Sequence, residues 1–390
     1  MKSLSLLTLT MVSLSISAST VTWRNLRLSI VTEMPEGYTV SYQFSKCMAN
    51  DLFTFSQVLM DDIIVNSATS DNIGPFLLSG GWTGGNHLMP DNTTHSAETT
   101  SIQVVVDGDT LNANATLNAQ KVVINVSNNI YNPSKDAELF CIEKIKYTVV
   151  GNSIQVEAQH LFCNPSPMVV SRYYGMQSMA IGETAILTPE GGAYNTWTPI
   201  GSIDRFTKIS APKFHQFIEK MPTCYQASYM LPEGLGTHYL IQDNDVVFIG
   251  NSYGKSYHKL MGNATVTNGE TTTWKGIYTW FKTPITDEVD GTFSYRGYKD
   301  GNEVVFSSSP PNEDVIEDVS EINEVTENKD KYIFATASNG QINVSKDVKY
   351  VKCYSINGQF VARGSGSLFV PAGLYILKDD NDHVLKLSVN

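Results

Sequence analysis

Short runs of alternating apolar and polar residues, separated by turn residues, constrain the fold of this chain most. Such runs predict strands, because successive side chains of a strand point to opposite faces of a sheet. Eight of them lie between Gly, Asn, Asp or Pro residues, at 38–44, 101–106, 121–126, 145–150, 154–162, 168–174, 246–249 and 272–281. So many strands predict an all-β fold, a large antiparallel β-sandwich that is jelly-roll-like or larger.

Helical periodicity is nearly absent from the chain. The exception is residues 213–221, where Phe214, Phe217, Ile218 and Met221 follow the i, i+3, i+4, i+7 spacing of one helix face. We therefore expect one short helix there. Hydrophobic residues make up 42% of the chain, which is enough for a sizeable core.

The five cysteines leave at least one thiol unpaired within a monomer, and Cys353 is the candidate because it stands apart in the tail. Cys141 and Cys163 flank a predicted hairpin that turns at residues 151–153. A two-residue loop sets Cys141 opposite Phe162, whereas a three-residue loop with a bulge sets the two cysteines opposite each other. A disulfide is thus conditional on the turn, and the alternative is two buried thiols.

The first residues have the organisation of an export signal. Lys2 gives a positive start, Leu4 to Ile16 form an apolar stretch, and residues 15–19 are mostly small, as at a signal-peptidase site. The stretch is shorter than the roughly 20 apolar residues of a spanning helix. We expect residues 1–19 to be a signal peptide and the mature protein, with no transmembrane segment, to be secreted or attached to the outer surface.

The formal net charge of -12 argues against nucleic acids and anionic membranes as partners, because a polyanion binder needs clustered Lys and Arg. Eight carboxylates lie between Asn312 and Asp330, with only Lys329 against them. Such a run is typical of a solvated, flexible linker. We predict a functional domain at 20–306, an acidic linker at 307–331 and a C-terminal module at 332–390.

The last forty residues form a second series of strand signals. An alternating run at 350–355 is followed by the pair Asn357-Gly358, which favours a tight turn, and then by runs at 360–363, 374–378 and 383–389. This order resembles the C-terminal sorting domain of proteins exported by the type IX secretion system of Bacteroidetes. The resemblance implies a small β-sandwich that the secretion machinery recognises. The alternative is an ordinary small β-sandwich end domain.

A Gly-rich stretch at residues 79–88 is the first candidate site. Its four glycines surround Trp82 and precede Asn86 and His87, so the backbone can approach a ligand closely. An exposed indole face and an amide suit sugar recognition, the ring stacking and the amide binding hydroxyl groups. The alternative is a surface loop whose glycines only satisfy turns, with His87 bonded structurally.

Residues 171–177 are the second candidate site. Elimination from a uronic acid polymer needs a residue such as Arg or Gln to neutralise the carboxylate, and a Tyr or His to move the proton. Arg172, Tyr174 and Gln177, with His160 or His87, are of these types, and alternation puts Arg172 and Tyr174 on one face. The set is loosely similar to jelly-roll polysaccharide lyases. The alternative is Tyr rings in the core with Arg172 at the surface.

The third candidate site is an aromatic strand. Period-two alternation places Trp274, Tyr278 and Trp280 on one face of residues 272–281. That face is predicted to be a sugar-stacking platform, and the alternative is a strand buried on both faces.

No strong metal or nucleophile pattern is present. The seven histidines include no His-x-x-x-His pair, and there is no Gly-x-Ser-x-Gly elbow. We expect no metal and no cofactor. The sequence therefore predicts a secreted or surface carbohydrate-active protein, with a polysaccharide lyase of acidic glycans as the leading hypothesis. The alternative is a non-catalytic glycan-binding or adhesive surface protein.

Overall fold

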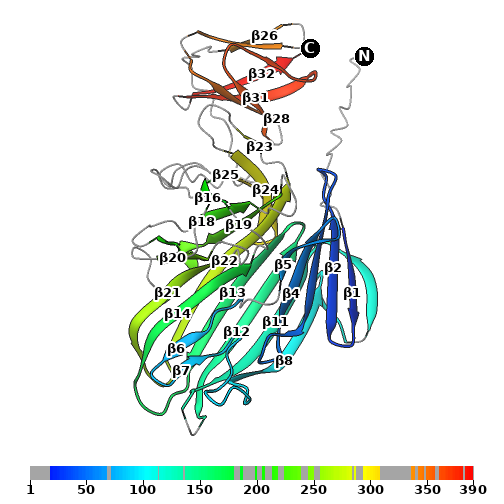
Figure 1. Cartoon of the computed structure of the whole chain (residues 1–390). Coiled ribbons are helices and arrows are strands. Elements are labelled where there is room, and N and C mark those ends of the chain that lie inside the picture. The colour runs from blue at the N-terminus through cyan, green and yellow to red at the C-terminus, as the bar shows by residue number, and fades with distance from the viewer. Residues whose placement is uncertain are drawn as a thin grey trace, which may run out of the picture. The chain divides into compact units, whose positions relative to one another are not determined.

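The computed structural model describes the backbone of residues 18–67, 72–112, 114–134, 137–179, 185–187, 198–199, 204–206, 213–217, 224–238, 245–249, 255–282, 285–286, 293–307, 335–338, 341–346, 348–355, 360–380 and 383–389. This backbone is almost entirely β-strand, with one 3-10 turn, η1, at Pro232–Gly234 (Figure 1). The all-β prediction is confirmed. Within these residues no helix has the length and apolarity needed to cross a membrane.

The chain divides into two compact units, Met1–Ile316 and Glu317–Asn390. The division falls inside the acidic segment that the sequence predicts to be a linker. Residues 308–334 lie outside the described residues.

Four antiparallel sheets build the described part of the larger unit. The first has six strands in the order β10 (Ala115–Ala119), β1 (Ser19–Arg24), β2 (Arg27–Glu33), β3 (Thr39–Cys47), β4 (Leu52–Met60) and β5 (Ile63–Ser67). The second has ten: β16 (Thr198–Pro199), β15 (Ala185–Leu187), β18 (Lys213–Phe217), β19 (Cys224–Met230), β22 (Thr271–Lys282), β13 (Ser153–Phe162), β12 (Leu139–Val150), β11 (Val122–Tyr131), β8 (Ala97–Val106) and β9 (Asp109–Thr110). The third has six: β17 (Asp204–Phe206), β20 (Asp245–Ile249), β21 (Lys255–Val266), β14 (Met168–Met179), β6 (Phe76–Leu78) and β7 (Gly81–Thr83). The fourth has three: β23 (Ile285–Thr286), β24 (Phe293–Lys299) and β25 (Asn302–Ser307).

All eight predicted strands are present, and the period-two pattern is the reason. In β11, buried and half-buried side chains alternate along all ten residues, as expected of a strand with one face on the core. The predicted helix was wrong over 213–217, which form β18 and pair with β19. Cross-strand pairing there overrides a short helical spacing of apolar residues, and residues 218–221 lie outside the described residues.

The core of the larger unit lies between the ten-stranded sheet and the two six-stranded sheets. From the first six-stranded sheet, Phe55 of β4 contacts the rings of Tyr147, Tyr278 and Trp280, at centroid distances of 6.0, 5.5 and 6.3 Å. From the second, Phe76 of β6 meets Phe162 of β13 at 6.3 Å, on the same face of the ten-stranded sheet as Tyr147 and Tyr278. Both six-stranded sheets therefore cover one face of the ten-stranded sheet, whose long strands β11, β12, β13 and β22 run side by side in Figure 1.

The β12–β13 hairpin turns through the two residues Gly151 and Asn152, because Val150 pairs with Ser153. Cys141 accordingly lies opposite Phe162, as the two-residue alternative requires. None of the five cysteines is in a disulfide, and Cys141, Cys224 and Cys353 are buried. No disulfide therefore closes this hairpin.

The smaller unit contains two sheets among its described residues. One has the order β26 (Ala335–Ser338), β27 (Gln341–Val344), β30 (Ser367–Phe369), and the other β29 (Phe360–Gly364), β28 (Val351–Ser355), β31 (Gly373–Asp379), β32 (Val384–Val389). Ile342, Val351 and Leu377 are buried in its own core. The predicted strands are present, the Asn357-Gly358 turn lies outside the described residues, and a role in sorting stays a prediction.

Replacing Gly151 with Ala tests the packing of the central hairpin. Gly151 has a φ of 52°, and an added Cβ would lie 2.2 Å from the ring of Tyr298. Gly151→Ala should lower the free energy of unfolding by about 3 kcal/mol, combining backbone strain with overpacking. Gly108 also has a positive φ, but a Cβ added there would meet nothing within 4 Å. Gly108→Ala should cost only about 1 kcal/mol, and equal losses in urea unfolding would contradict the role of Tyr298.

Candidate functional site

Trp82, His87 and Tyr174 form a group of three stacked rings, here called the Trp82 stack. The Trp82 ring lies 5.4 Å from the ring of His87 at an interplanar angle of 21°, and 5.7 Å from that of Tyr174 at 23°. Trp82 and His87 are half-buried, and Tyr174 is 7% exposed. Two segments of the sequence, far apart along the chain, thus meet at one aromatic surface.

Cross-strand pairing adds Arg172 to the same face. Arg172 of β14 lies opposite Leu77 of β6, and Leu77 lies opposite Trp82 of β7. Residues directly opposite each other in an antiparallel pair point to the same side of the sheet. The exposed Arg172 side chain therefore shares a face with the Trp82 stack.

Alternation along β14 sends its two neighbouring tyrosines to opposite faces. At this point β21 contains one extra residue, Leu260, because Tyr173 pairs with Met261 and Tyr174 with Lys259. Tyr173 faces the core, where its ring stacks on Phe76 at 4.3 Å and its hydroxyl accepts a hydrogen bond from Trp274 Nε1 at 2.8 Å. Tyr174 reaches the other face, and Gly74 packs so tightly against its carbonyl that a Cβ would lie 1.0 Å from that oxygen. The backbone that carries Tyr174 is thereby fixed.

A tight turn brings His87 back over Trp82. Gly84 and Gly85 have φ angles of 77° and 50°, and His87 N donates to the Gly84 carbonyl at 3.1 Å. Few residues other than glycine adopt such angles without cost. The glycines of this loop therefore form its turn.

Asn50, which no sequence pattern indicates, holds the loop in place. Its Nδ2 donates to the carbonyls of Gly85 and His87 at 2.8 and 2.9 Å, and its Oδ1 accepts from Ser96 N at 2.8 Å. Asn50 is 1% exposed. It could not be found beforehand, because it is one polar residue in a turn with no motif around it. Asn86, a predicted sugar ligand, is exposed, and its Oδ1 accepts from Ala49 N at 2.7 Å.

His160 lies in the core, away from the exposed face. Its side chain is fully buried, and Nε2 is hydrogen-bonded to Glu143 Oε2 at 3.0 Å. Glu143 Oε1 accepts from Asn128 at 2.9 Å, and Asn128 Oδ1 accepts from Thr99 Oγ1 at 2.8 Å. These four residues, the polar row, lie on neighbouring strands β13, β12, β11 and β8. The polar row gives His160 a structural role, so the prediction of His160 as a catalytic proton carrier was wrong.

The remaining predicted ligands are also buried. Trp274, Tyr278 and Trp280 are no more than 1% exposed, so the alternative of a strand buried on both faces applies and the sugar-stacking platform was wrong. Gln177 is 2% exposed, and its Nε2 donates to the Tyr174 carbonyl at 2.9 Å. The period-two pattern identifies the shared face correctly but does not say that a second sheet covers it.

Of the predicted catalytic residues, the structure therefore brings Arg172, Tyr174 and His87 to one face and leaves His160 in the core. The described residues contain no group of three or more His, Cys, Asp or Glu side chains that could hold a metal ion. The exposed face offers a guanidinium group for hydrogen bonds to an anion and an aromatic surface for an apolar ring face. Both groups can hold a ligand in place.

Comparisons with known proteins find partial structural likenesses. No protein-family model matches, and no curated protein does. The galactosidase domain of the α-galactosidase–sucrose kinase AgaSK has a TM-score of 0.43 at 9% identity, covering 67% of this chain and 42% of that one. The α-galactosidase AgaB from Geobacillus stearothermophilus has a TM-score of 0.40 at 10% identity, covering 65% and 41%. The Slr1438 protein from Synechocystis sp. PCC 6803 has a TM-score of 0.37 at 11% identity, covering 67% and 98%. The matched part thus spans about two fifths of the two galactosidases.

Replacing Glu143 with Ala tests the polar row. Glu143→Ala leaves His160 and Asn128 buried without their shared partner, and should lower the free energy of unfolding by about 3 kcal/mol. Glu157 makes a matched control, because it pairs with Lys146 at 2.9 Å on the exposed face of the same sheet. Glu157→Ala should cost less than about 1 kcal/mol. If Glu143→Ala and Glu157→Ala lower the free energy of unfolding in urea by the same amount, the polar row stabilises the fold no more than an exposed ion pair does.

Proposed function

We propose that this chain is a non-catalytic glycan-binding protein whose contact surface is the Trp82 stack together with Arg172. The observation that carries the proposal is the placement of an exposed guanidinium group in register with a half-buried Trp that stacks on two further rings. Sugars present an apolar C–H face to aromatic rings and hydroxyl or carboxylate groups to charged donors.

The burial of the candidate proton carriers favours binding over elimination. His160 is fully buried in the polar row, and Tyr174 is 7% exposed beneath Trp82. A general base must come within hydrogen-bond reach of the proton that it removes. A lyase would therefore depend on His87, because the other two predicted groups are covered.

Replacing Trp82 tests the contact surface. Trp82→Ala should weaken binding to the recognised glycan about ten-fold, because the stack loses its middle ring, on which the half-buried His87 ring is held. The measurement is a panel of neutral and acidic polysaccharides followed by titration calorimetry on each one that binds. Trp23 is the matched control, a half-buried Trp of β1 that meets Phe53 edge-on at 6.0 Å.

Trp23→Ala should leave the affinity unchanged, with folding of both variants checked by circular dichroism. If Trp82→Ala binds as tightly as the wild type, the contact surface lies elsewhere. The same panel, read by absorbance for new unsaturated sugar ends, tests the lyase hypothesis. Such ends from the wild type that Arg172→Ala fails to produce would contradict a non-catalytic role.

We also infer that the chain is exported, from the export signal at its start and the sorting-domain resemblance of its tail. The tail would then be the part that the secretion machinery recognises. Ser19 belongs to the folded domain, so the export signal would end at Ala18, one residue earlier than the boundary of 1–19 predicted from the sequence. Ser19 is the first residue of β1, lies opposite Ala119 and is 3% exposed, with its hydroxyl 2.7 Å from that of Thr32.

Cleavage of the signal should therefore occur at or before the Ala18–Ser19 bond, so that β1 stays whole. The measurement is the mass of the N-terminal peptide of the exported protein, made in a bacterial host with residues 1–19 intact. Loss of Ser19 would remove a buried hydrogen bond, at a cost of about 1 kcal/mol. A mature chain that begins at Thr20 or later would contradict this assignment.

A further inference from the structure

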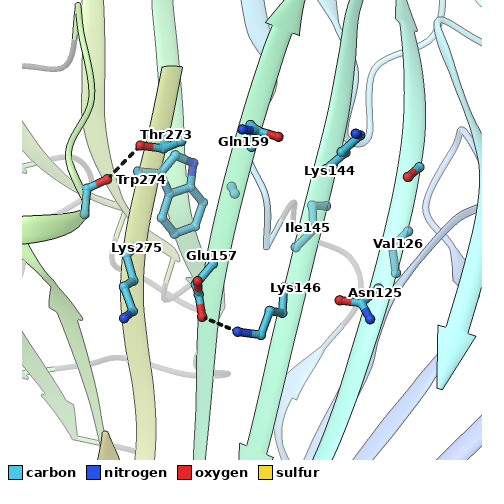
Figure 2. A pocket seen from close by; sticks show the side chains of 13 residues that line it. Asn125, Val126, Lys144, Ile145, Lys146, Glu157, Gln159, Thr273, Trp274 and Lys275 are labelled. Carbon is cyan, nitrogen blue, oxygen red and sulfur yellow. Dashed lines mark hydrogen bonds and ion pairs between the residues drawn. The ribbon is translucent and has the colours of Figure 1, made fainter. Parts of the chain in front are cut away.

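The exposed face of the ten-stranded sheet contains a depression of about 430 Å³, and none of the residues that line it belongs to the Trp82 stack. It lies over β11, β12, β13 and β22 and is bordered by Gly234 of η1 (Figure 2). Next to it, the three-stranded sheet covers the same face, with Tyr295 and Phe306 packed on Phe281 and Tyr229. The depression begins where that cover ends.

Two rows of polar side chains form the floor of the depression. Cross-strand pairing sets them side by side on β11, β12, β13 and β22: the first row is Asn125, Lys146, Glu157 and Lys275, and the second is Ser127, Lys144, Gln159 and Thr273. Neighbouring strands lie about 4.8 Å apart, so each row is about 14 Å long. Trp274 borders the depression, but its ring is 1% exposed. Recognition here rests on charge and hydrogen bonds.

The charges of the first row are compensated within the protein. Lys146 pairs with Glu157 at 2.9 Å, and Lys275 pairs with Asp300 at 2.7 Å. Burial of Asp300 opposes its ionisation, but hydrogen bonds from Lys275 and Gln155 outweigh burial and lower its pKa. Lys275 is therefore held by an ionised partner near neutral pH.

Lys144 in the second row has no ion-pair partner among the described residues. Its cross-strand neighbours are Ser127 and Gln159, which are neutral. It is exposed, and Lys146 lies two residues along the same strand on the same face. One uncompensated positive charge thus lies in the depression, although the whole chain carries a net charge of -12. An anionic group of a ligand fits at Lys144.

We propose that this depression binds an acidic oligosaccharide, with a sugar carboxylate at Lys144 and sugar hydroxyl groups at Gln159, Ser127 and Thr273. The amide and hydroxyl groups beside Lys144 match the hydroxyl groups of a sugar. The Thr273 hydroxyl already donates to the Gly234 carbonyl at 3.2 Å, which leaves its oxygen to accept from the ligand.

The single uncompensated lysine explains why the ligand carries widely spaced charges. With Asp300, the first row is neutral overall, so a second anionic group placed close to the one at Lys144 meets no further uncompensated positive charge. A nucleic acid strand carries one negative charge about every 3.4 Å, and most of its phosphates would have no cationic partner here. A sugar chain with one carboxylate per ring places hydroxyl groups between its charges, and four strands accommodate a short segment of it.

Titration calorimetry of the full chain with trigalacturonate tests this site. The matched ligand is the same trisaccharide with its carboxyl groups reduced to alcohols. Trigalacturonate should bind more tightly than the reduced form, and its affinity should fall as salt is added, because the contact is largely electrostatic. Lys144→Ala should weaken binding of trigalacturonate about five-fold, while Lys144→Arg, which keeps the charge, should stay within about two-fold of the wild type.

Lys46 provides the matched control, because it is an exposed lysine of β3 in a different sheet. Lys46→Ala should bind trigalacturonate as the wild type does, and thermal unfolding checks that all the variants are folded. The proposal is overturned if trigalacturonate does not bind, if the reduced trisaccharide binds equally well, or if Lys144→Ala and Lys46→Ala behave alike. The site is independent of the Trp82 stack, so Lys144→Ala leaves the test of Trp82 unaffected.

Discussion

The fold of the larger unit depends on the need to cover one apolar face of the ten-stranded sheet, and two six-stranded sheets share that cover. Phe55 packs on Tyr147 and Tyr278 from the first six-stranded sheet, and Phe76 packs on Phe162 from the second. Because side chains alternate along a strand, the residues between these core positions are forced to the opposite face. The apolar contacts inside thus decide which polar groups line the depression outside, and a slip of one residue would exchange the two sets.

The polar row adds a second constraint inside the same layer. Glu143 meets both Asn128 and His160 only when the three strands are paired as they are. Shifting one of these strands by one residue would leave the Glu143 carboxylate among apolar rings without its partners, at a cost of several kcal/mol. Thr99 extends the constraint to the first sheet, because its Oγ1 accepts a hydrogen bond from Phe53 N of β4 at 2.9 Å. The buried polar groups therefore penalise wrong alignments of strands and of sheets.

Much of the fold was predictable from the sequence, and the site only in part. Alternation is a local property, so the eight strands and the shared face of Arg172 and Tyr174 follow from it. The helix over 213–217 was wrong because a short apolar run fits two periods, and pairing with β19 selects the strand. Burial of Trp280 and His160 depends on which sheets pack together. The hydrogen bonds from Asn50 to the Gly-rich loop join residues about 35 positions apart. Alternation within one strand predicts neither of these long-range contacts.

The thiols of the buried cysteines bear on how the chain folds. Burial raises the pKa of the Cys353 thiol to about 11 and that of Cys224 to about 12, which keeps both protonated and unreactive near neutral pH. No disulfide ties together any two of the described strands. The described strands are consequently held together by backbone pairing and by the packing of side chains between sheets.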